Sequence, residues 1–226
     1  MQILVCNDDG VSSPILEALA LMLKPYGEVM VIAPSFNQSA KSHSINIEEH
    51  NASELTFYKE VEGIKFYQQP YTPVQSVLFC LKFTNFKPDL IVSGINKGYN
   101  LGIDTFYSGT VAVAREACLK SIYSLAFSVA YDYEANDLIF VRKMLDTIMK
   151  FKLYSKNYSL NINIPKNIKE FNFEFCPIDS VFEKCKTDIS IINEGKISVS
   201  PLTVKMTDYS ALLDMKKIFD ISLLFF

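Results

Sequence analysis

Short apolar runs alternate with segments of helical spacing along most of this chain. Five runs have the length and composition of strands buried on both faces, at residues 3–6, 29–33, 90–92, 122–129 and 160–164. Between them, apolar side chains recur every three or four residues, which predicts helices over 14–24, 73–83, 111–120 and 137–151. The alternation predicts an α/β protein with a doubly wound, mostly parallel sheet.

Two pairs of short apolar segments are separated by a Glu-Gly dipeptide, which favours a tight turn. Residues 55–61 and 64–67 flank Glu62-Gly63, and residues 189–192 and 197–200 flank Glu194-Gly195. The pattern therefore predicts a β-hairpin at each place.

The pattern changes after Pro165, where regular strand and helix alternation gives way to shorter segments. Residues 171–176 predict a further strand, residues 207–219 predict a last helix, and Leu223–Phe226 form an apolar tail. We therefore divide the chain into a core, residues 1–165, and a C-terminal arm, residues 166–226, packed on the same domain. A monomer would leave the apolar tail exposed, so we expect the arm to take part in oligomerisation.

Polar side chains follow the first strand without a spacer, in the sequence Asn7-Asp8-Asp9-Gly10. Two adjacent carboxylates raise each other's pKa unless a cation lies between them, and a divalent metal removes that cost. Parallel sheets place their ligands outside the carboxyl ends of the strands, where this pair is expected. The alternative is that Asn7 and Asp8 form an Asx turn and Asp9 is merely solvated.

Two further polar stretches follow predicted strands. The loop 35–44 is rich in hydroxyl and amide side chains and is expected beside the acidic pair. The stretch 93–110 contains four glycines and leads into the helix predicted at 111–120. Long loops inside compact domains are usually functional, and a helix N-terminus binds phosphate readily. A plain Ser or Thr cap explains the second stretch equally well when it is taken alone.

Composition narrows the classes of protein that this chain can belong to. Among its 226 residues no apolar run reaches about 18, and no basic segment precedes an apolar one at the start, so we expect a cytoplasmic protein that does not span a membrane. Its net charge of −3 argues against a DNA or RNA polymer as partner. The five cysteines are widely spaced and odd in number, which favours buried apolar side chains over a disulfide or zinc framework.

Several common catalytic patterns are absent from the sequence. It contains no GxxxxGK[ST] loop, no GxGxxG after the first strand and no GxSxG elbow. Only two histidines exist, which removes most histidine-based metal sites and makes a histidine-dependent catalytic triad a weak hypothesis. We interpret His50 as a solvated side chain and keep His43, in the polar loop, as a candidate contact of the site.

Six sequence words stand in an order that is specific when taken together. They are NDDG at 7–10, APxxNQSA at 33–40, PDLIVSGINxGxNLG at 88–102, YSGT at 107–110, LNINIP at 160–165 and SVSPL at 198–202. On these words the chain resembles the SurE family of metal-dependent nucleotidases over most of its length. The resemblance implies a Rossmann-like, three-layer α/β core and a C-terminal β-hairpin and helix arm that exchanges between subunits of a homodimer or homotetramer.

The resemblance also implies an activity and a ligand set. It implies hydrolysis of nucleoside 5′- and 3′-monophosphates, with one Mg²⁺ or Mn²⁺ per subunit held by Asp8, Asp9, Ser39 and Asn96, of which Asp8, Asp9 and Asn96 are catalytic. Carboxylate, hydroxyl and amide oxygens suit these hard cations, which keep waters and bind a substrate phosphate; one such water is the expected nucleophile. The predicted phosphate contacts are Asn7, Gly94, Lys97, Ser108, Gly109 and Thr110.

The sequence departs from the family pattern in two words. The usual TPxDCV reads Thr72-Pro73-Val74-Gln75-Ser76-Val77, and the usual DxTxH has Lys205 and Tyr209 at its acid and imidazole positions. The segment between Ile178 and Lys184 is also shorter than is usual in the family. Lys205 and Tyr209 are therefore candidate site residues. Two alternatives stay open: a non-catalytic member that binds metal and nucleotide, and a receiver-like signalling domain, which also carries an acidic pair after its first strand.

Overall fold

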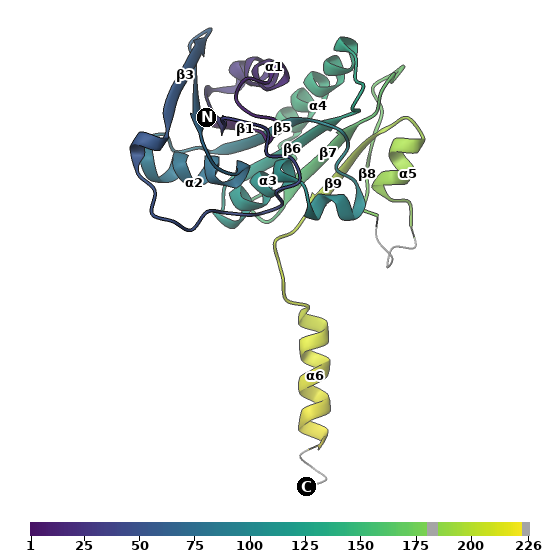
Figure 1. Ribbon diagram of the computed structural model, residues 1–226. Coiled ribbons are helices and arrows are strands. Elements are labelled where there is room, and N and C mark those ends of the chain that lie inside the picture. Colours follow the sequence, from purple (N-terminus) through teal and green to yellow (C-terminus); the bar gives the residue numbers. More distant parts are fainter. Residues whose placement is uncertain (180–184, 223–226) are drawn as a thin grey trace.

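A single nine-stranded sheet forms the centre of the computed structural model, which describes residues 1–179 and 185–222 (Figure 1). The strands are ordered β3-β4-β2-β1-β5-β6-β7-β9-β8, and all neighbours are parallel except β3–β4 and β7–β9. Their bounds are β1 Gln2–Cys6, β2 Glu28–Pro34, β3 Thr56–Val61, β4 Ile64–Gln69, β5 Leu90–Lys97, β6 Tyr123–Val129, β7 Ser159–Ile164, β8 Phe173–Phe175 and β9 Ile197–Leu202.

Helices cover both faces of the sheet, with α1 and α4 on one face and α2 and α3 on the other (Figure 1). The helices are α1 Pro14–Leu23, α2 Pro73–Phe83, α3 Gly109–Leu119, α4 Leu138–Phe151, α5 Asp188–Asn193 and α6 Tyr209–Ser222; 3₁₀ turns are η1 Lys24–Tyr26, η2 Ala52–Glu54, η3 Gly102–Phe106 and η4 Ala135–Asp137. The structure thus confirms the α/β fold class and its mostly parallel, three-layer core.

Strand β1 shows why the apolar runs are continuous. Its residues Ile3 and Val5 pack into the cluster under α1 and α4, whereas Leu4 and Cys6 pack under α2 and α3. All four are fully buried. A strand covered on both faces needs apolar side chains at every position, and this removes the alternation seen in half-exposed strands.

The hairpin predicted around Glu62-Gly63 is confirmed as the antiparallel pair β3–β4. The third predicted strand was too short, because β5 continues from Val92 to Lys97 and its register with β6 shifts between Ser93 and Asn96. Gly94, Asn96 and Lys97 therefore lie on the end of a strand and not in the predicted loop.

The hairpin predicted around Glu194-Gly195 is wrong. Residues 188–193 form helix α5, and β9 pairs instead with β7 and β8. A capping box at Thr187 and Ser190 starts this helix, and Gly195, at φ +73°, follows its end. Local capping chemistry outweighed the β-branched composition of the segment.

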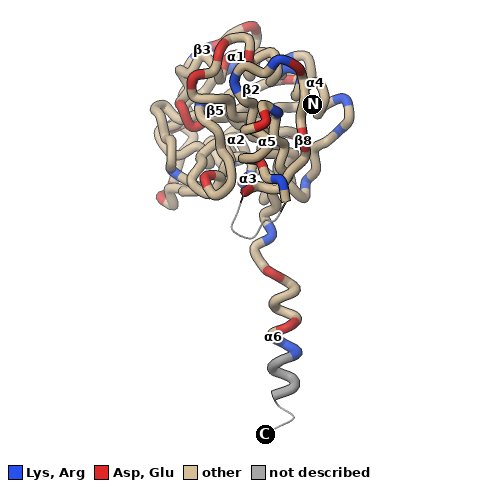
Figure 2. Tube along the Cα trace, turned by 90° about the vertical axis from the view of Figure 1, so that its right-hand side faces the viewer, with Lys and Arg blue, Asp and Glu red and all other residues tan. Residues whose placement is uncertain are grey.

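Helix α6 stands away from the body of the molecule (Figure 1). Its side chains are exposed throughout residues 209–217, including Tyr209, Leu212 and Leu213. Figure 2 shows acidic and basic residues interspersed over one side of the body and along α6. The predicted apolar tail, Leu223–Phe226, lies outside the described residues, as do residues 180–184. In the described chain, no helix has the length and apolarity needed to cross a membrane.

Candidate functional site

The turn after β1 is closed by the side chain of Asn7. Its Nδ2 donates to the carbonyl of Gly10 (3.0 Å), and the Gly10 N–H donates back to its Oδ1 (3.2 Å). Asn7 is fully buried, so both of its polar groups serve the turn. The predicted Asx-type turn is therefore present at Asn7, and it leaves the two aspartates free for other contacts.

Asp8 faces the N-terminus of α3. The Thr110 hydroxyl donates to Asp8 Oδ1 (2.7 Å), and the Thr110 N–H donates to Oδ2 (3.2 Å). Burial raises the pKa of Asp8, while these two hydrogen bonds oppose the rise. A Cβ at Gly109 would lie 3.0 Å from Asp8 Cβ, so the helix approaches this carboxyl as closely as a glycine permits. Helix and carboxylate stabilise each other, because the helix N-terminus carries partial positive charge.

Asp9 is the less satisfied member of the pair. Its Oδ1 accepts from Asn37 Nδ2 at 3.4 Å, whereas its Oδ2 is buried and has no hydrogen-bond partner among the described residues. Burial raises the pKa of Asp9 to about 6, with a further contribution from the Asp8 charge, and Lys97 opposes the shift. The opposition by Lys97 places the end of β5 beside the end of β1, as the register of Cys6 with Ser93 requires.

The loop 35–44 and the end of β5 bring the other two predicted ligands toward this pair. The Gln38 N–H donates to the Asp8 carbonyl (2.7 Å), so Ser39 follows one residue after an anchored position. Asn96 Nδ2 donates to the Gly98 carbonyl (2.8 Å), which leaves its Oδ1 as the atom that can face a cation. Asn37, which the sequence analysis did not single out, belongs to the same NQSA word as Ser39.

The remaining predicted phosphate residues have structural partners of their own. Ser108 Oγ accepts from the Val111 N–H (3.0 Å) and caps α3, so the plain cap reading is correct for its side chain. Gly94 has φ +125°, and a Cβ there would lie 2.4 Å from the Phe127 carbonyl of β6. Glycine at this position is required by the close approach of two strands.

His43 lies beside α3, where its Nε2 is 2.9 Å from Glu116 Oε2. It also lines a hollow of about 690 Å³, together with Phe106, Arg115 and Lys205. Tyr209 is exposed at the start of α6. Within the described part of the chain, none of His43, Lys205 and Tyr209 forms a hydrogen bond or ion pair with Asp8 or Asp9.

The interpretation of His50 as a solvated residue is wrong. Its ring contacts Glu54 Oε2 (3.2 Å) and the Asn46 carbonyl (3.1 Å), and it packs against Tyr71 with ring centroids 4.4 Å apart. Gln75, at the position of the family's missing acid, is buried and accepts from the Asn46 N–H (3.0 Å). Gln75 thereby holds residues 46–50 on α2.

With this geometry in place, comparison with known proteins identifies the family. The family model described as survival protein SurE matches residues 3–182. The chain belongs to the SurE family. It is 33% identical to the 5′-nucleotidase SurE of Caldanaerobacter subterraneus subsp. tengcongensis, over 92% of this chain and 94% of that protein. It is 31% identical to the 5′-nucleotidase SurE of Clostridium botulinum, over 97% of this chain and all of that protein.

A solved member of the SurE family supports the same fold. The crystal structure of the SurE protein from Aquifex aeolicus superposes with a TM-score of 0.76 at 29% sequence identity, covering 96% of this chain and 99% of that chain. The receiver-like alternative is therefore set aside.

The donor set of this SurE family member suits a hard divalent cation. Among the described residues no group of three or more His, Cys, Asp or Glu side chains could hold a metal ion. The candidate ligands are instead the carboxylates of Asp8 and Asp9 with the predicted Ser39 hydroxyl and Asn96 amide, and oxygen donors of these kinds are the ones that Mg²⁺ and Mn²⁺ prefer. The buried, unpartnered Oδ2 of Asp9 is the observation that supports this fit, because such an atom costs free energy unless a partner binds it.

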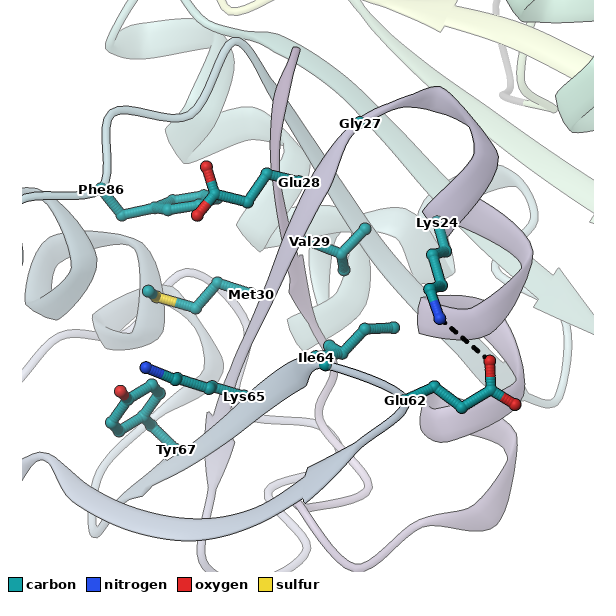
Figure 3. A pocket seen from close by; sticks show the side chains of 11 residues that line it. Lys24, Gly27, Glu28, Val29, Met30, Glu62, Ile64, Lys65, Tyr67 and Phe86 are labelled. Atoms are coloured by element: carbon teal, nitrogen blue, oxygen red, sulfur yellow. Dashed lines mark hydrogen bonds and ion pairs between the residues drawn. The ribbon is translucent and has the colours of Figure 1, made fainter.

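A second hollow lies at the amino ends of the strands, away from the candidate site (Figure 3). It has about 290 Å³ and is lined by residues from the amino ends of β2 and β4, among them Glu28, Met30 and Lys65. The Lys24–Glu62 ion pair (3.1 Å) lies at its side. Because Asp8 and Asp9 follow the carboxyl end of β1, this hollow is separate from the candidate site.

The raised pKa of Asp9 makes the stability of the metal-free protein depend on pH. Its ordinary value is 3.8 and its folded value is about 6, so folding favours the protonated carboxyl. Stability is therefore expected to fall as pH rises from about 4 to 6 and to remain lower above 6. After a discount for the partial exposure of this carboxyl, we expect a loss of about 1 to 2 kcal/mol.

Urea unfolding of chelator-treated protein at several pH values measures this effect. Other carboxyls titrate in the same range, so the informative quantity is the difference in unfolding free energy between Asp9→Asn and the unmodified chain. That difference should grow in favour of the variant as pH rises from about 4 to 6 and should level off above 6. A difference that is constant with pH would contradict the assignment of a raised pKa to Asp9.

Proposed function

We propose that this chain is a divalent-metal-dependent phosphomonoesterase that hydrolyses nucleoside 5′- and 3′-monophosphates to nucleoside and phosphate. The observation that carries the proposal is the pair Asp8–Asp9 at the carboxyl end of β1, of which Asp8 is buried and Asp9 partly buried. The Oδ2 of Asp9 has no hydrogen-bond partner among the described residues, and the N-terminus of α3 lies against Asp8. The relatives named 5′-nucleotidase SurE support the substrate class.

In this proposal the chain's own residues bind and orient the substrate. Asp8, Asp9, Ser39 and Asn96 would hold one Mg²⁺ or Mn²⁺, which when bound supplies Lewis-acid polarisation of a phosphoryl oxygen. Lys97, whose charge and backbone N–H both oppose the pKa rise of Asp9, would add positive charge beside the pair and attract an anionic phosphate. Thr110 fixes the orientation of the Asp8 carboxylate.

Release of inorganic phosphate from nucleoside 5′- and 3′-monophosphates tests the proposal. The purified chain is assayed with Mg²⁺, with Mn²⁺ and with excess chelator. Metal-dependent release that chelator abolishes supports the assignment. Binding of Mn²⁺ and nucleotide without turnover would show instead the non-catalytic member of the family that the sequence left open.

We also propose that residues 1–165 form the catalytic unit and that residues 166–226 serve oligomerisation, in a dimer or tetramer. Tyr209, Leu212 and Leu213 follow helical spacing on α6 and are all exposed, with Leu213 56% exposed. A helix of 14 residues is marginal in water by itself, so such a stripe needs a packing partner.

The thiols Cys6, Cys80 and Cys118 are buried, which suits a reducing compartment, and we propose the cytoplasm.

Light scattering at micromolar concentration should therefore give at least a dimer. Leu212→Lys combined with Leu213→Lys is expected to shift the protein to monomer, because two charges would be buried in the interface. Ala211→Lys, on the opposite side of the same helix, is the matched control and should leave the mass unchanged. A monomeric unmodified chain would contradict the proposal.

Replacement of the family's acid and imidazole by Lys205 and Tyr209 should weaken activity without removing it. General acid or base help is worth about 10² to 10⁴ in rate, whereas the acidic pair is intact. We expect Lys205→Asp combined with Tyr209→His to raise kcat on nucleoside monophosphates. An unchanged or lower kcat in the double variant would show that these positions are not missing catalytic groups.

A further inference from the structure

Residues 98–107 connect two parts of the proposed site. The segment begins directly after Asn96 and Lys97 at the end of β5, and it ends at Ser108, which caps α3. Asn96 Nδ2 donates to the carbonyl of Gly98, the first residue of this segment (2.8 Å), so the conformation of the segment bears on where that amide lies.

Asn100, in the middle of this segment, is fastened to the sheet by four hydrogen bonds. Its N–H donates to Asn163 Oδ1 (2.8 Å), and its carbonyl accepts from Asn161 Nδ2 (2.8 Å) and Asn163 Nδ2 (3.1 Å). Its own Nδ2 donates to Ser128 Oγ (2.8 Å). All four residues are buried, so water does not compete for these bonds.

A second anchor comes from the C-terminal part of the chain. The Gly102 N–H donates to Asp188 Oδ2 (2.9 Å), and Asp188 Oδ1 accepts from the N–H groups of Asp179 (2.7 Å) and Ile189 (2.9 Å). Asp188 is fully buried at the start of α5. One carboxylate thus ties the segment to α5 and to residue 179 at the same time.

The third anchor is on the side of α3. Thr105 Oγ1 donates to the Gly102 carbonyl (2.8 Å), and Arg115 Nη2 contacts Thr105 Oγ1 (3.4 Å). The Arg115 guanidinium also lies over the Phe106 ring, 5.1 Å from its centroid. The segment is therefore held by the sheet, by α5 and by α3.

Strand β7 carries asparagines where its own stability would favour apolar residues. Leu160, Ile162 and Ile164 face the cluster under α4, whereas Asn161 and Asn163 alternate with them toward the other face. Burying an amide costs free energy unless it is fully hydrogen-bonded, and Asn161 Oδ1 has no partner among the described residues. Both asparagines direct their donors to Asn100, so their function is to hold that residue.

We propose that Asn161, Asn163 and Asp188 are positioning residues, which set the conformation of residues 98–107 and thereby align Asn96 with the acidic pair. The inference rests on the proposed function, since alignment matters only if Asn96 acts at that site. This role accounts for the contacts that residues 160–165 and α5 make with the segment, although neither contributes a ligand to the proposed site. Displacing a ligand through its supporting contacts typically costs about 10- to 100-fold in metal affinity or activity.

Two substitutions separate positioning from mere stability. Asp188→Asn keeps the shape of the side chain and one oxygen, which can still accept from Asp179 and Ile189, but its amide group cannot accept from Gly102. Asn163→Leu removes the contacts to Asn100 and adds an apolar side chain to a buried strand. Asp137→Asn is the matched control, because Asp137 is also buried and accepts two backbone N–H groups, from Glu134 and Asn167, outside the segment.

Three measurements are made on each full-length variant: amide hydrogen exchange, Mn²⁺ affinity by titration calorimetry, and kcat/KM on a nucleoside monophosphate. We expect the Asn100 amide in Asn163→Leu and the Gly102 amide in Asp188→Asn to lose protection, while the amides of β7 stay protected. Mn²⁺ affinity and kcat/KM should each fall about 10- to 100-fold in both variants, and less than 3-fold in Asp137→Asn.

Unchanged Mn²⁺ affinity and kcat/KM in variants whose segment amides have lost protection would overturn the inference. The same holds if Asp137→Asn is affected as strongly as the two test variants. If Asn163→Leu fails to fold, Asp188→Asn decides. An unmodified chain without phosphatase activity would refute the proposed function alone, because exchange and Mn²⁺ affinity still test the positioning.

Discussion

Asp9→Asn is expected to lower kcat/KM for phosphate release by on the order of 10³-fold or more, and Asp8→Asn is expected to do the same. Each change removes a charged oxygen ligand from the proposed metal site. The fold should persist, because neither carboxyl is needed to complete the sheet. For Asp9→Asn, the metal-free protein should even gain stability at neutral pH, since the substitution removes a buried charge whose Oδ2 has no partner among the described residues.

Phosphate release at saturating Mn²⁺, together with thermal unfolding of the same samples, measures both effects. Asp89→Asn is the control, because Asp89 accepts the Gln2 N–H (2.8 Å) at the amino end of β1. The candidate site lies at the other end of that strand. The control variant should retain full activity. Turnover close to that of the unmodified chain in Asp8→Asn or Asp9→Asn would refute the metal-site assignment.

Gly109→Ala is expected to reduce kcat/KM by about 10- to 100-fold, although alanine in a helix is normally favourable. The new Cβ would lie 3.0 Å from Asp8 Cβ, 3.1 Å from Asp8 Oδ2 and 2.9 Å from Pro73 Cγ. Asp8 and α3 must then move apart, and the hydrogen bonds from Thr110 to Asp8 lengthen. The ordinary gain of about 0.5 to 1 kcal/mol from replacing glycine in a helix is therefore not expected.

Gly63→Ala separates loss of activity from loss of stability. Gly63 has φ +82° in the β3–β4 turn, with nothing within 4 Å of an added Cβ, so alanine there costs backbone strain alone. In Gly63→Ala we expect a lower melting temperature with unchanged kcat/KM. In Gly109→Ala we expect the larger effect on kcat/KM and the smaller one on the melting temperature. Full activity in Gly109→Ala would show that α3 does not need to approach Asp8 so closely.

The sequence alone was sufficient for the elements whose signals are local. The apolar runs of β1, β2, β6 and β7 and the helical spacing of α2 and α4 matched the structure closely. The end of β5 was misjudged, because the glycine and asparagine that suggest a loop lie in a strand that closely approaches β6. Helix α5 was missed, because the segment Ile189–Ile192 has strand-like composition while its capping box determines its conformation.

The candidate site was predictable wherever its residues follow one another in the chain. Asn7, Asp8 and Asp9 adjoin in sequence, and the topology rule for parallel sheets places them at a ligand-binding edge. The family words supplied Ser39 and Asn96, which no spacing argument would have selected. Lys205 and Tyr209 were candidates on the same ground, and the described contacts do not join them to the pair.

By itself the sequence determined the family, the α/β class and the place of the acidic pair, because these depend on local periodicity and on words of consecutive residues. Only the tertiary structure decided which partner each polar group has. In the tertiary structure the Thr110 hydroxyl donates to Asp8 and the Gly102 N–H donates to Asp188. The Oδ2 of Asp9 has no partner among the described residues. Those pairs are 86 or 102 residues apart in the chain, and their contact depends on burial and packing of whole strands and helices, which no local pattern encodes.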